Sequence, residues 1–144
     1  WHVAAAIDAH TDLLIANQYY SLAGPCTDMC LKEIAAQSML DTASGRELVS
    51  GVATAKGVTE DFATGMEARV LGEVAMATAG MKVEKVNEII EQLVGDYERK
   101  FTHAPKGKRF QECYDVDTVR PSREYVDVYR KFREDLTNLG LDFK

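Results

Sequence analysis

Two amides, two phenols and two thiols lie close together near the start of the sequence. Residues 17–20 read NQYY, and Cys26 and Cys30 follow a Gly-Pro turn. Amides and phenols can hold a small polar substrate through a few convergent hydrogen bonds in an otherwise apolar pocket. Two thiols can bind a metal ion or exchange a disulfide. The stretch therefore suggests a metal site, a redox pair or the polar rim of a pocket.

A zinc site is the weakest of these three interpretations. Cys26 and Cys30 are four residues apart and can share one face of a helix. Structural zinc needs four ligands, and no second pair of Cys or His at suitable spacing accompanies them, so we expect no metal. We interpret both thiols as small buried side chains near the start of a helix. A reactive thiol with a lowered pKa is the alternative.

Other titratable residues fit structural roles. His10 lies on a predicted helical face with Ile7, so we interpret it as a core histidine, or one that orients another group, rather than as a metal ligand. Thr64 and Glu67 have the spacing of a capping box, and Arg69 and Glu73 can form a pair on one helix face. A general acid and base drawn from these carboxylates is the less favoured reading. The sequence contains no P-loop, GxGxxG, GxSxG or HExxH motif.

Composition excludes several partners. The chain has 144 residues, a hydrophobic content of 46% and a net charge of −6. This acidic balance argues against a surface that follows nucleic-acid phosphates. No apolar run is long enough to span a bilayer, and no signal peptide is recognisable, so we expect a cytoplasmic protein that does not bind membranes. Three cysteines, an odd number, fit free thiols in a reducing compartment.

Hydrophobic periodicity predicts mostly helix with two short strands. Continuous apolar runs predict buried strands at residues 13–16 and 47–53, where small residues interrupt the second run. Apolar spacing, capping signals and stop residues predict helices over residues 3–12, 27–42, 64–80, 83–100 and 122–139. Pro25 suits the first turn of the second helix. The segment of residues 102–117 contains Pro105 and Gly107, and we expect it to be irregular.

The order of these elements leaves two folds open. Two βα units match part of a parallel α/β fold, but two strands do not make a stable parallel sheet alone. Either the apolar runs are not strands and the chain is a helical bundle, or neighbouring strands lie upstream. In a (β/α)8 barrel, polar residues at the carboxyl ends of the strands form the active site. Asn17 and Gln18 directly follow the first predicted strand, so we expect them at such a position.

In the alternative, purely structural interpretation, the polar residues at 17–20 only cap a turn at the end of a strand. Tyr19 and Tyr20 are equally compatible with an interface between proteins.

A resemblance to a known family rests on an ordered set of uncommon strings that extends over essentially all 144 residues. These strings are NQYY, AGPCT-MC, AQS, DTASGRE, SGVA-AKGV, TGMEAR, GEVA-ATAG and FQECYDV-TV. In this order they resemble the C-terminal part of monomethylamine:corrinoid methyltransferases, which belong to the pyrrolysine-containing methylamine methyltransferases.

The resemblance implies the C-terminal portion of a (β/α)8 TIM barrel, mostly helical in this chain, with two short parallel strands. Residues 1–80 would be the last two βα units, and residues 81–144 a helical extension packed on the barrel. Such enzymes move the methyl group of monomethylamine onto the Co(I) corrinoid, a cobalamin, of a cognate corrinoid protein during methanogenesis. The corrinoid is carried by that partner, so no cofactor is expected to bind this chain directly. A homo-oligomer is also expected.

Site residues follow from the same resemblance. Pyrrolysine, whose ring imine captures the amine, and the carboxylates beside it are expected upstream, so no catalytic residue is assigned in this chain. Gln18 matches a substrate-pocket position by its place in NQYY, and Asn17, Tyr19 and Tyr20 follow as its neighbours. We expect the isolated chain to be inactive and its cysteines to be structural. A noncatalytic helical interaction domain and a dimethylamine-specific relative are the alternatives.

Overall fold

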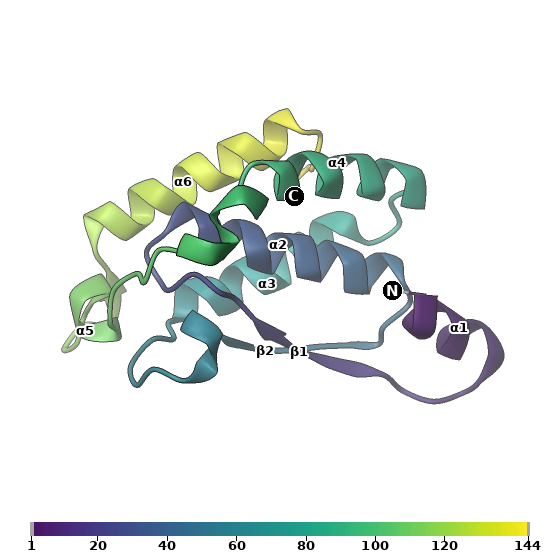
Figure 1. The fold of residues 1–144 in the computed structure, drawn as a ribbon, viewed down its shortest axis with the longest axis horizontal. Helices are drawn as coiled ribbons and strands as arrows, with labels where there is room; N and C mark the ends of the chain where they lie inside the picture. The colour runs from purple at the N-terminus through teal and green to yellow at the C-terminus, as the bar shows by residue number, and fades with distance from the viewer. Residues whose placement is uncertain (1, 144) are drawn as a thin grey trace.

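A two-stranded parallel sheet with helices stacked over one of its faces forms the framework of the chain (Figure 1). The computed structural model describes residues 2–143. Its elements are α1 (His2–His10), β1 (Ala16–Tyr20), α2 (Asp28–Ala43), β2 (Leu48–Ala53), α3 (Gly65–Thr78), α4 (Val83–Gly95), α5 (Phe110–Cys113), β3 (Tyr114–Asp115), β4 (Arg120–Pro121) and α6 (Arg123–Asn138), with 3-10 turns η1 (Ala55–Gly57) and η2 (Glu98–His103). The parallel pair shows that the helical-bundle alternative was wrong.

The two parallel strands contain a bulge opposite the middle of β1. Gln18 is paired with Ser50, but Tyr19 is paired with Val52, so Gly51 is the additional residue of β2. The φ of Gly51 is 45°. Glycine adopts this left-handed conformation without a steric penalty, which explains its place in the bulge.

The first strand lies further along the chain than its apolar run predicted. We expected residues 13–16, whereas β1 contains Ala16–Tyr20 and therefore includes the NQYY stretch. Leu13 and Leu14 are 65% and 84% exposed, because no element among residues 2–143 covers them. The position of the strand depends on its backbone pairing with β2, so hydrophobicity alone does not predict it. The predicted second strand is confirmed to within one residue at its start.

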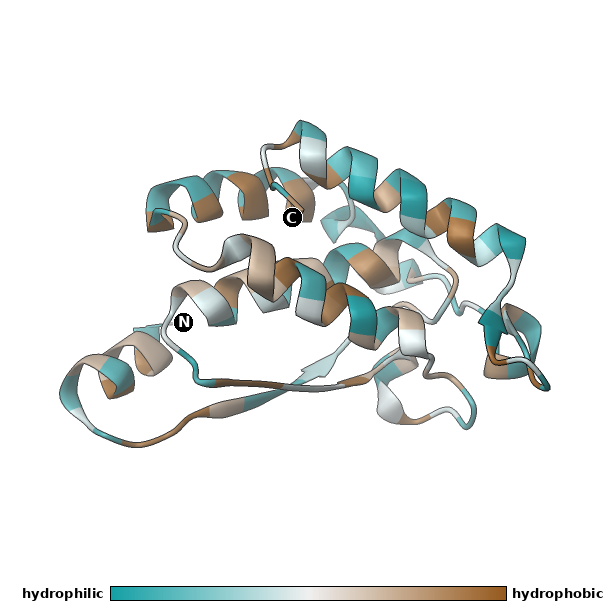
Figure 2. Cartoon of the chain, turned by 180° about the vertical axis from the view of Figure 1, so that it is seen from behind, coloured by the Kyte–Doolittle hydropathy of each residue, from teal (hydrophilic) through white to brown (hydrophobic). Residues whose placement is uncertain are grey.

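Among residues 2–143, helices cover only one face of the sheet. In Figures 1 and 2, α2 and α3 lie directly over the strands, and α4 and α6 form a further layer above them. The outer helices are amphipathic, with their hydrophilic residues turned outward (Figure 2). Leu31, Ile34, Val70, Leu93 and Phe132 are fully buried between these layers. No helix among the described residues is both long enough and apolar enough to cross a membrane.

Local capping signals set the starts of three helices. Thr27 caps α2 by accepting a hydrogen bond from the backbone N–H of Cys30 at 3.3 Å. Ser122 caps α6 in the same way, with the N–H of Tyr125 at 3.2 Å. The capping box of Thr64 and Glu67 is present at the start of α3, as predicted.

Two helices differ from their predictions. The predicted helix over residues 83–100 ends at Gly95, where low helix propensity favours a stop, and η2 follows. In α6 the fully buried residue near the start is Tyr125, and Val126 is only half-buried.

The segment predicted as irregular contains α5 and the short β3–β4 hairpin. The division at residue 80 stays a prediction, and α4 and α6 beyond it pack directly on α2.

The first helix makes little contact with the rest. Only Ala4 of α1 is buried, and Val3 is 73% exposed. His10 is exposed, so the interpretation of it as a core histidine was wrong. The apolar spacing correctly predicted a helix, but Val3 and His10 on the face expected to be buried are exposed.

Candidate functional site

The candidate site lies on the uncovered face of β1 and β2. Successive side chains of a strand point to opposite faces, so Gln18 and Tyr20 share one face and Asn17 and Tyr19 share the other. Gln18 is exposed and Tyr20 is 53% exposed, whereas Tyr19 is fully buried against the helices. The expectation that these residues follow the strand was wrong, since all four belong to it. The structure therefore brings Gln18 and Tyr20 together and turns Asn17 and Tyr19 away from them.

Asn17 and Tyr19 contact a polar cluster at the end of α2. The side-chain amide of Asn17 donates a hydrogen bond to Asp41 at 2.7 Å, and Asp41 is paired with Arg46 at 2.8 Å. The Tyr19 hydroxyl has no hydrogen-bond partner among the described residues. Burial, and then the nearby Asp41 carboxylate, raise the pKa of Tyr19, so its phenol stays protonated. These two residues anchor the strand to the helical layer.

A buried carboxylate fixes the loop that follows β1. Glu33 is 5% exposed and accepts the backbone N–H groups of Leu22 and Ala23 at 3.1 and 2.9 Å. Burial raises the pKa of Glu33, although the two N–H donors oppose the shift. Gly24 lies against Lys106, and its N–H donates to the carbonyl of Pro105 at 3.0 Å. The loop is thus held between α2 and the segment that precedes α5.

The loop after β2 borders an open cavity of about 260 Å³ at the carboxyl end of the strand. Its lining is Val52, Ala53, Thr54, Gly57, Thr59, Asp61, Phe62 and Ala63. Thr54 is buried and donates its hydroxyl proton to the carbonyl of Phe62, which closes the loop on itself. Asp61 accepts a hydrogen bond from the side chain of Gln111 at 2.8 Å. Because ligands of parallel α/β folds bind at the carboxyl ends of strands, the cavity lies where a site is expected.

The cysteines lie together in the core beneath these loops. All three, Cys26, Cys30 and Cys113, are free and buried. Burial raises the pKa of each thiol, that of Cys113 to about 12. The interpretation of Cys26 and Cys30 as small buried thiols is confirmed, and a raised pKa disfavours the thiolate, which is the reactive form. In the part of the chain that the structure describes, no group of three or more His, Cys, Asp or Glu could hold a metal ion.

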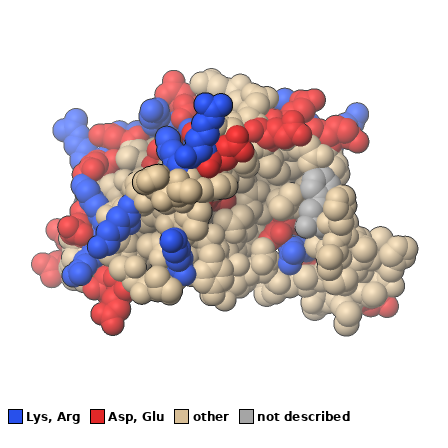
Figure 3. Space-filling view, in the orientation of Figure 1, with Lys and Arg blue, Asp and Glu red and all other residues tan. Residues whose placement is uncertain are grey.

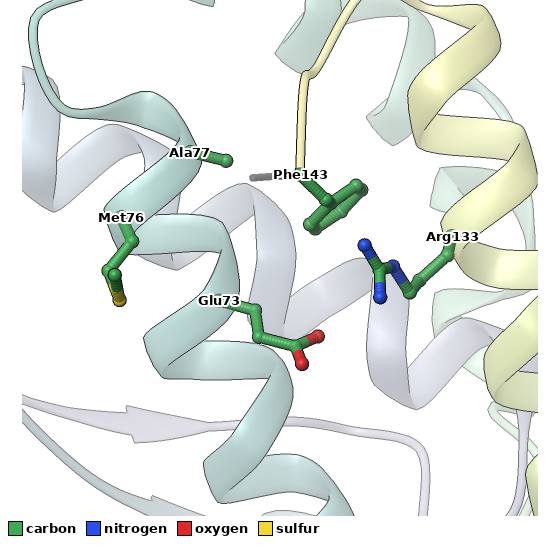
Figure 4. Close-up of a pocket in the computed structure, with 5 residues that line it drawn as sticks. All are labelled: Glu73, Met76, Ala77, Arg133 and Phe143. Carbon is green, nitrogen blue, oxygen red and sulfur yellow. The ribbon is translucent and has the colours of Figure 1, made fainter.

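A second, smaller cavity of about 100 Å³ lies between α3 and the end of the chain (Figure 4). It is lined by Glu73, Met76, Ala77, Arg133 and Phe143. Glu73 pairs with Arg69 at 2.7 Å and accepts a hydrogen bond from Tyr129 at 2.5 Å. The predicted pair of Arg69 and Glu73 on one helix face is therefore confirmed, and the contacts of the Glu73 carboxylate fit a structural role.

Charged residues are unevenly distributed over the surface. Lys, Arg, Asp and Glu gather over α4 and α6, whereas the surface around α1 carries few of them (Figure 3). The open face of the sheet is also free of charge, since neither Ala16–Tyr20 nor Leu48–Ala53 contains a charged residue. Its polar groups are the amide of Gln18, the phenol of Tyr20 and the hydroxyl of Ser50.

These features define a parallel α/β protein whose helices cover one face of the sheet and whose neutral polar side chains lie on the other. Comparison with known families makes the assignment specific, because the model of the family described as monomethylamine methyltransferase MtmB matches residues 1–141. The chain belongs to this family.

Individual relatives agree over nearly the whole chain. Monomethylamine methyltransferase MtmB1 of Methanosarcina acetivorans is 58% identical over 139 residues, and MtmB1 of Methanosarcina barkeri is 59% identical over the same length. Each match covers 96% of this chain and 30% of the relative. The chain thus spans less than a third of the length of these curated relatives.

Solved structures confirm the predicted fold class. The crystal structure of the M. barkeri monomethylamine methyltransferase superposes with a TM-score of 0.95 at 58% identity, over 97% of this chain and 31% of that chain. A crystal structure of a hydroxylamine complex of MtmB superposes equally well, with a TM-score of 0.95. The chain is a portion of this α/β barrel fold, rich in helix and with two short parallel strands.

Proposed function

We propose that residues 1–144 form part of a methyltransferase that moves the methyl group of monomethylamine to the Co(I) corrinoid of a cognate corrinoid protein. The segment contributes one wall of the substrate pocket. Membership of the monomethylamine methyltransferase family supports the reaction, and identity of 57–59% to relatives of that name supports the substrate. The whole enzyme acts in the cytoplasm in methanogenesis from methylamine, as a homo-oligomer.

The exposed side chain of Gln18 on the uncovered face of the sheet is the observation that carries this proposal. In a barrel, the strand side chains that turn away from the helices point into the interior. Polypeptide from the remainder of the enzyme would complete the cylinder over this face. The exposed amide of Gln18 then becomes part of a pocket wall.

Gln18 and Tyr20 are the residues proposed to contact the substrate. A carboxamide offers both a donor and an acceptor, and a phenol offers one of each. These groups can orient a small amine without adding a charge that would compete with its own. Asn17 and Tyr19 lie on the opposite face, and we assign to them the support of the strand, Asn17 through its hydrogen bond to Asp41 and Tyr19 through its burial against the helices.

The corrinoid supplies the Co(I) nucleophile that accepts the methyl group, and the corrinoid protein carries it. Pyrrolysine, expected in the upstream part of the enzyme, supplies the electrophile for the amine. The open face of the sheet is suited to lie beside the pyrrolysine, because this face is neutral and has an amide, a phenol and a hydroxyl. The residues of this chain bind and orient the amine, which contributes to the rate through proximity.

A site for small amines is consistent with the hydroxylamine complex known for MtmB, since hydroxylamine and methylamine are of similar size. The competing proposal is a noncatalytic helical interaction domain, and a dimethylamine-specific relative is a variant of the first. Methylation of a Co(I) corrinoid protein by the full-length product, with monomethylamine and with dimethylamine, separates these cases.

We expect methylation with monomethylamine and an in-frame amber codon upstream of the codon for Trp1. No methylation with either amine, in a product whose gene lacks such a codon, would contradict the enzyme proposal. Methylation with dimethylamine but not with monomethylamine would show that the substrate is dimethylamine.

A further inference from the structure

The ring of Tyr20 packs against a residue that has no side chain. Tyr20 ends β1, and Gly57 ends the turn η1 that follows β2. A Cβ atom at position 57 would lie 2.9 Å from Cε1 of Tyr20 and 3.2 Å from Cβ of Ala53. Carbon atoms in ordinary contact are about 3.5–4.0 Å apart, so a side chain here and the present position of the ring are incompatible.

The backbone of η1 is held firmly against the end of β1. The N–H of Lys56 donates to the carbonyl of Ser21 at 2.8 Å, and the N–H of Ala55 donates to that of Ala23 at 3.1 Å. Ala55 and Lys56 have φ values of 50° and 65°, which residues with side chains rarely adopt. Such strained conformations persist only where surrounding contacts impose them, and they occur often at functional sites.

We propose that Gly57 is a positioning residue that fixes the orientation of the Tyr20 ring on the open face of the sheet. This inference rests on the proposed function, in which Tyr20 contacts the amine. The turn η1 cannot easily move away, because its two backbone hydrogen bonds bind it to the loop after β1. A methyl group at position 57 therefore displaces the ring by roughly 0.5–1 Å, and a misplacement of this size lowers turnover by up to about 100-fold.

The chain offers a matched control in Gly80. Gly57 and Gly80 have similar left-handed φ values of 69° and 81°, but a Cβ at position 80 would meet no atom within 4 Å. Alanine at either position introduces the same backbone strain, of about 1 kcal/mol for a left-handed residue. Only alanine at position 57 also displaces an aromatic ring.

The test measures kcat and KM for methylamine in the full-length methyltransferase with Gly57→Ala, Tyr20→Ala, the double variant and Gly80→Ala. We expect Gly57→Ala to lower kcat/KM by about 10- to 100-fold and Gly80→Ala to change it by less than about 2-fold. We expect the double variant to be no worse than Tyr20→Ala, because no ring remains to be displaced. Losses that multiply, or equal effects of the two glycine substitutions, would overturn the inference.

Asparagine tolerates the left-handed region and still has a Cβ, so Gly57→Asn and Gly80→Asn repeat the comparison if an alanine variant does not fold. The same pattern of losses is expected from this pair, and equal effects of the two would again overturn the inference. Unchanged turnover in Tyr20→Ala would also overturn the inference, because the orientation of the ring would then have no effect on the reaction. That result would leave the proposed function in place if Gln18→Ala still impairs turnover.

Discussion

The buried carboxylate of Glu67 gives the sharpest prediction about stability. Glu67 is 1% exposed, and its Oε2 accepts the backbone N–H of Thr64 at 2.7 Å and the Thr64 hydroxyl at 2.6 Å. Its Oε1 accepts the hydroxyl of Tyr125, which is fully buried. Glu67→Ala removes the capping box, worth about 1 kcal/mol, and leaves the proton of the buried Tyr125 hydroxyl without its acceptor, which costs about 1–3 kcal/mol. We expect a local destabilisation of about 2–4 kcal/mol.

Hydrogen exchange of the α3 amides in the full-length enzyme measures this change directly. A loss of 2–4 kcal/mol corresponds to exchange about 30- to 1,000-fold faster if the amides exchange through opening of α3. Glu91→Ala, an exposed position on α4, is the matched control and should change exchange by less than about 2-fold. Exchange of α3 in Glu67→Ala within about 3-fold of the wild type would refute the reasoning.

Glu67→Gln tests the charge separately from the hydrogen bonds. A glutamine can still accept from Thr64 and can donate to the Tyr125 hydroxyl. Burial raises the pKa of Glu67 in the folded protein, so the stability linked to this group is greatest below the pKa of the unfolded chain. That stability is lost as the pH rises through the folded pKa. We therefore expect the protection of α3 in Glu67→Gln, relative to the wild type, to increase from about pH 4 to pH 7. A constant ratio would show that Glu67 has no raised pKa.

Two further predictions concern the core. Lys32 lies 3.0–3.7 Å from the carboxylates of Asp28, Asp96 and Asp135, so Lys32→Ala should destabilise the junction of α2 and α6 by about 1–2 kcal/mol. The loss, seen as faster hydrogen exchange in α6, should shrink in about 1 M salt, because the remaining carboxylates then repel one another less. The buried cysteines, with the pKa of Cys113 raised to about 12, should not react with a disulfide reagent at about pH 8 until the protein is denatured. Rapid reaction of a thiol in the native protein would contradict that burial.

Local signals in the sequence predicted the helices well. The predicted capping box of Thr64 and Glu67 depends on residues three positions apart, and it appears in the structure. The contact of Lys32 with Asp96 joins residues 64 positions apart, and no sequence pattern indicated it. Interactions of this range depend on how helices pack, which a single sequence does not disclose.

The first strand shows why the candidate site was only partly predictable. The apolar run at residues 13–16 favoured a buried strand there, but the strand begins at Ala16 and includes the polar residues. Two consecutive tyrosines, which favour strands, and Gly51 as a possible bulge in the partner were the available signals. With the strand correctly placed, alternation separates Gln18 and Tyr20 from Asn17 and Tyr19 without any structure.

The central claim is that the amide of Gln18 orients the amine in a pocket completed by the remainder of the enzyme. Its most direct test is kcat/KM for methylamine-dependent methylation of a Co(I) corrinoid protein by full-length Gln18→Ala, with Gln92→Ala as the control at an exposed position on α4. We predict a loss of at least about 10-fold for Gln18→Ala and less than about 2-fold for Gln92→Ala. Equal turnover by the two variants would remove Gln18 from the site and contradict the account.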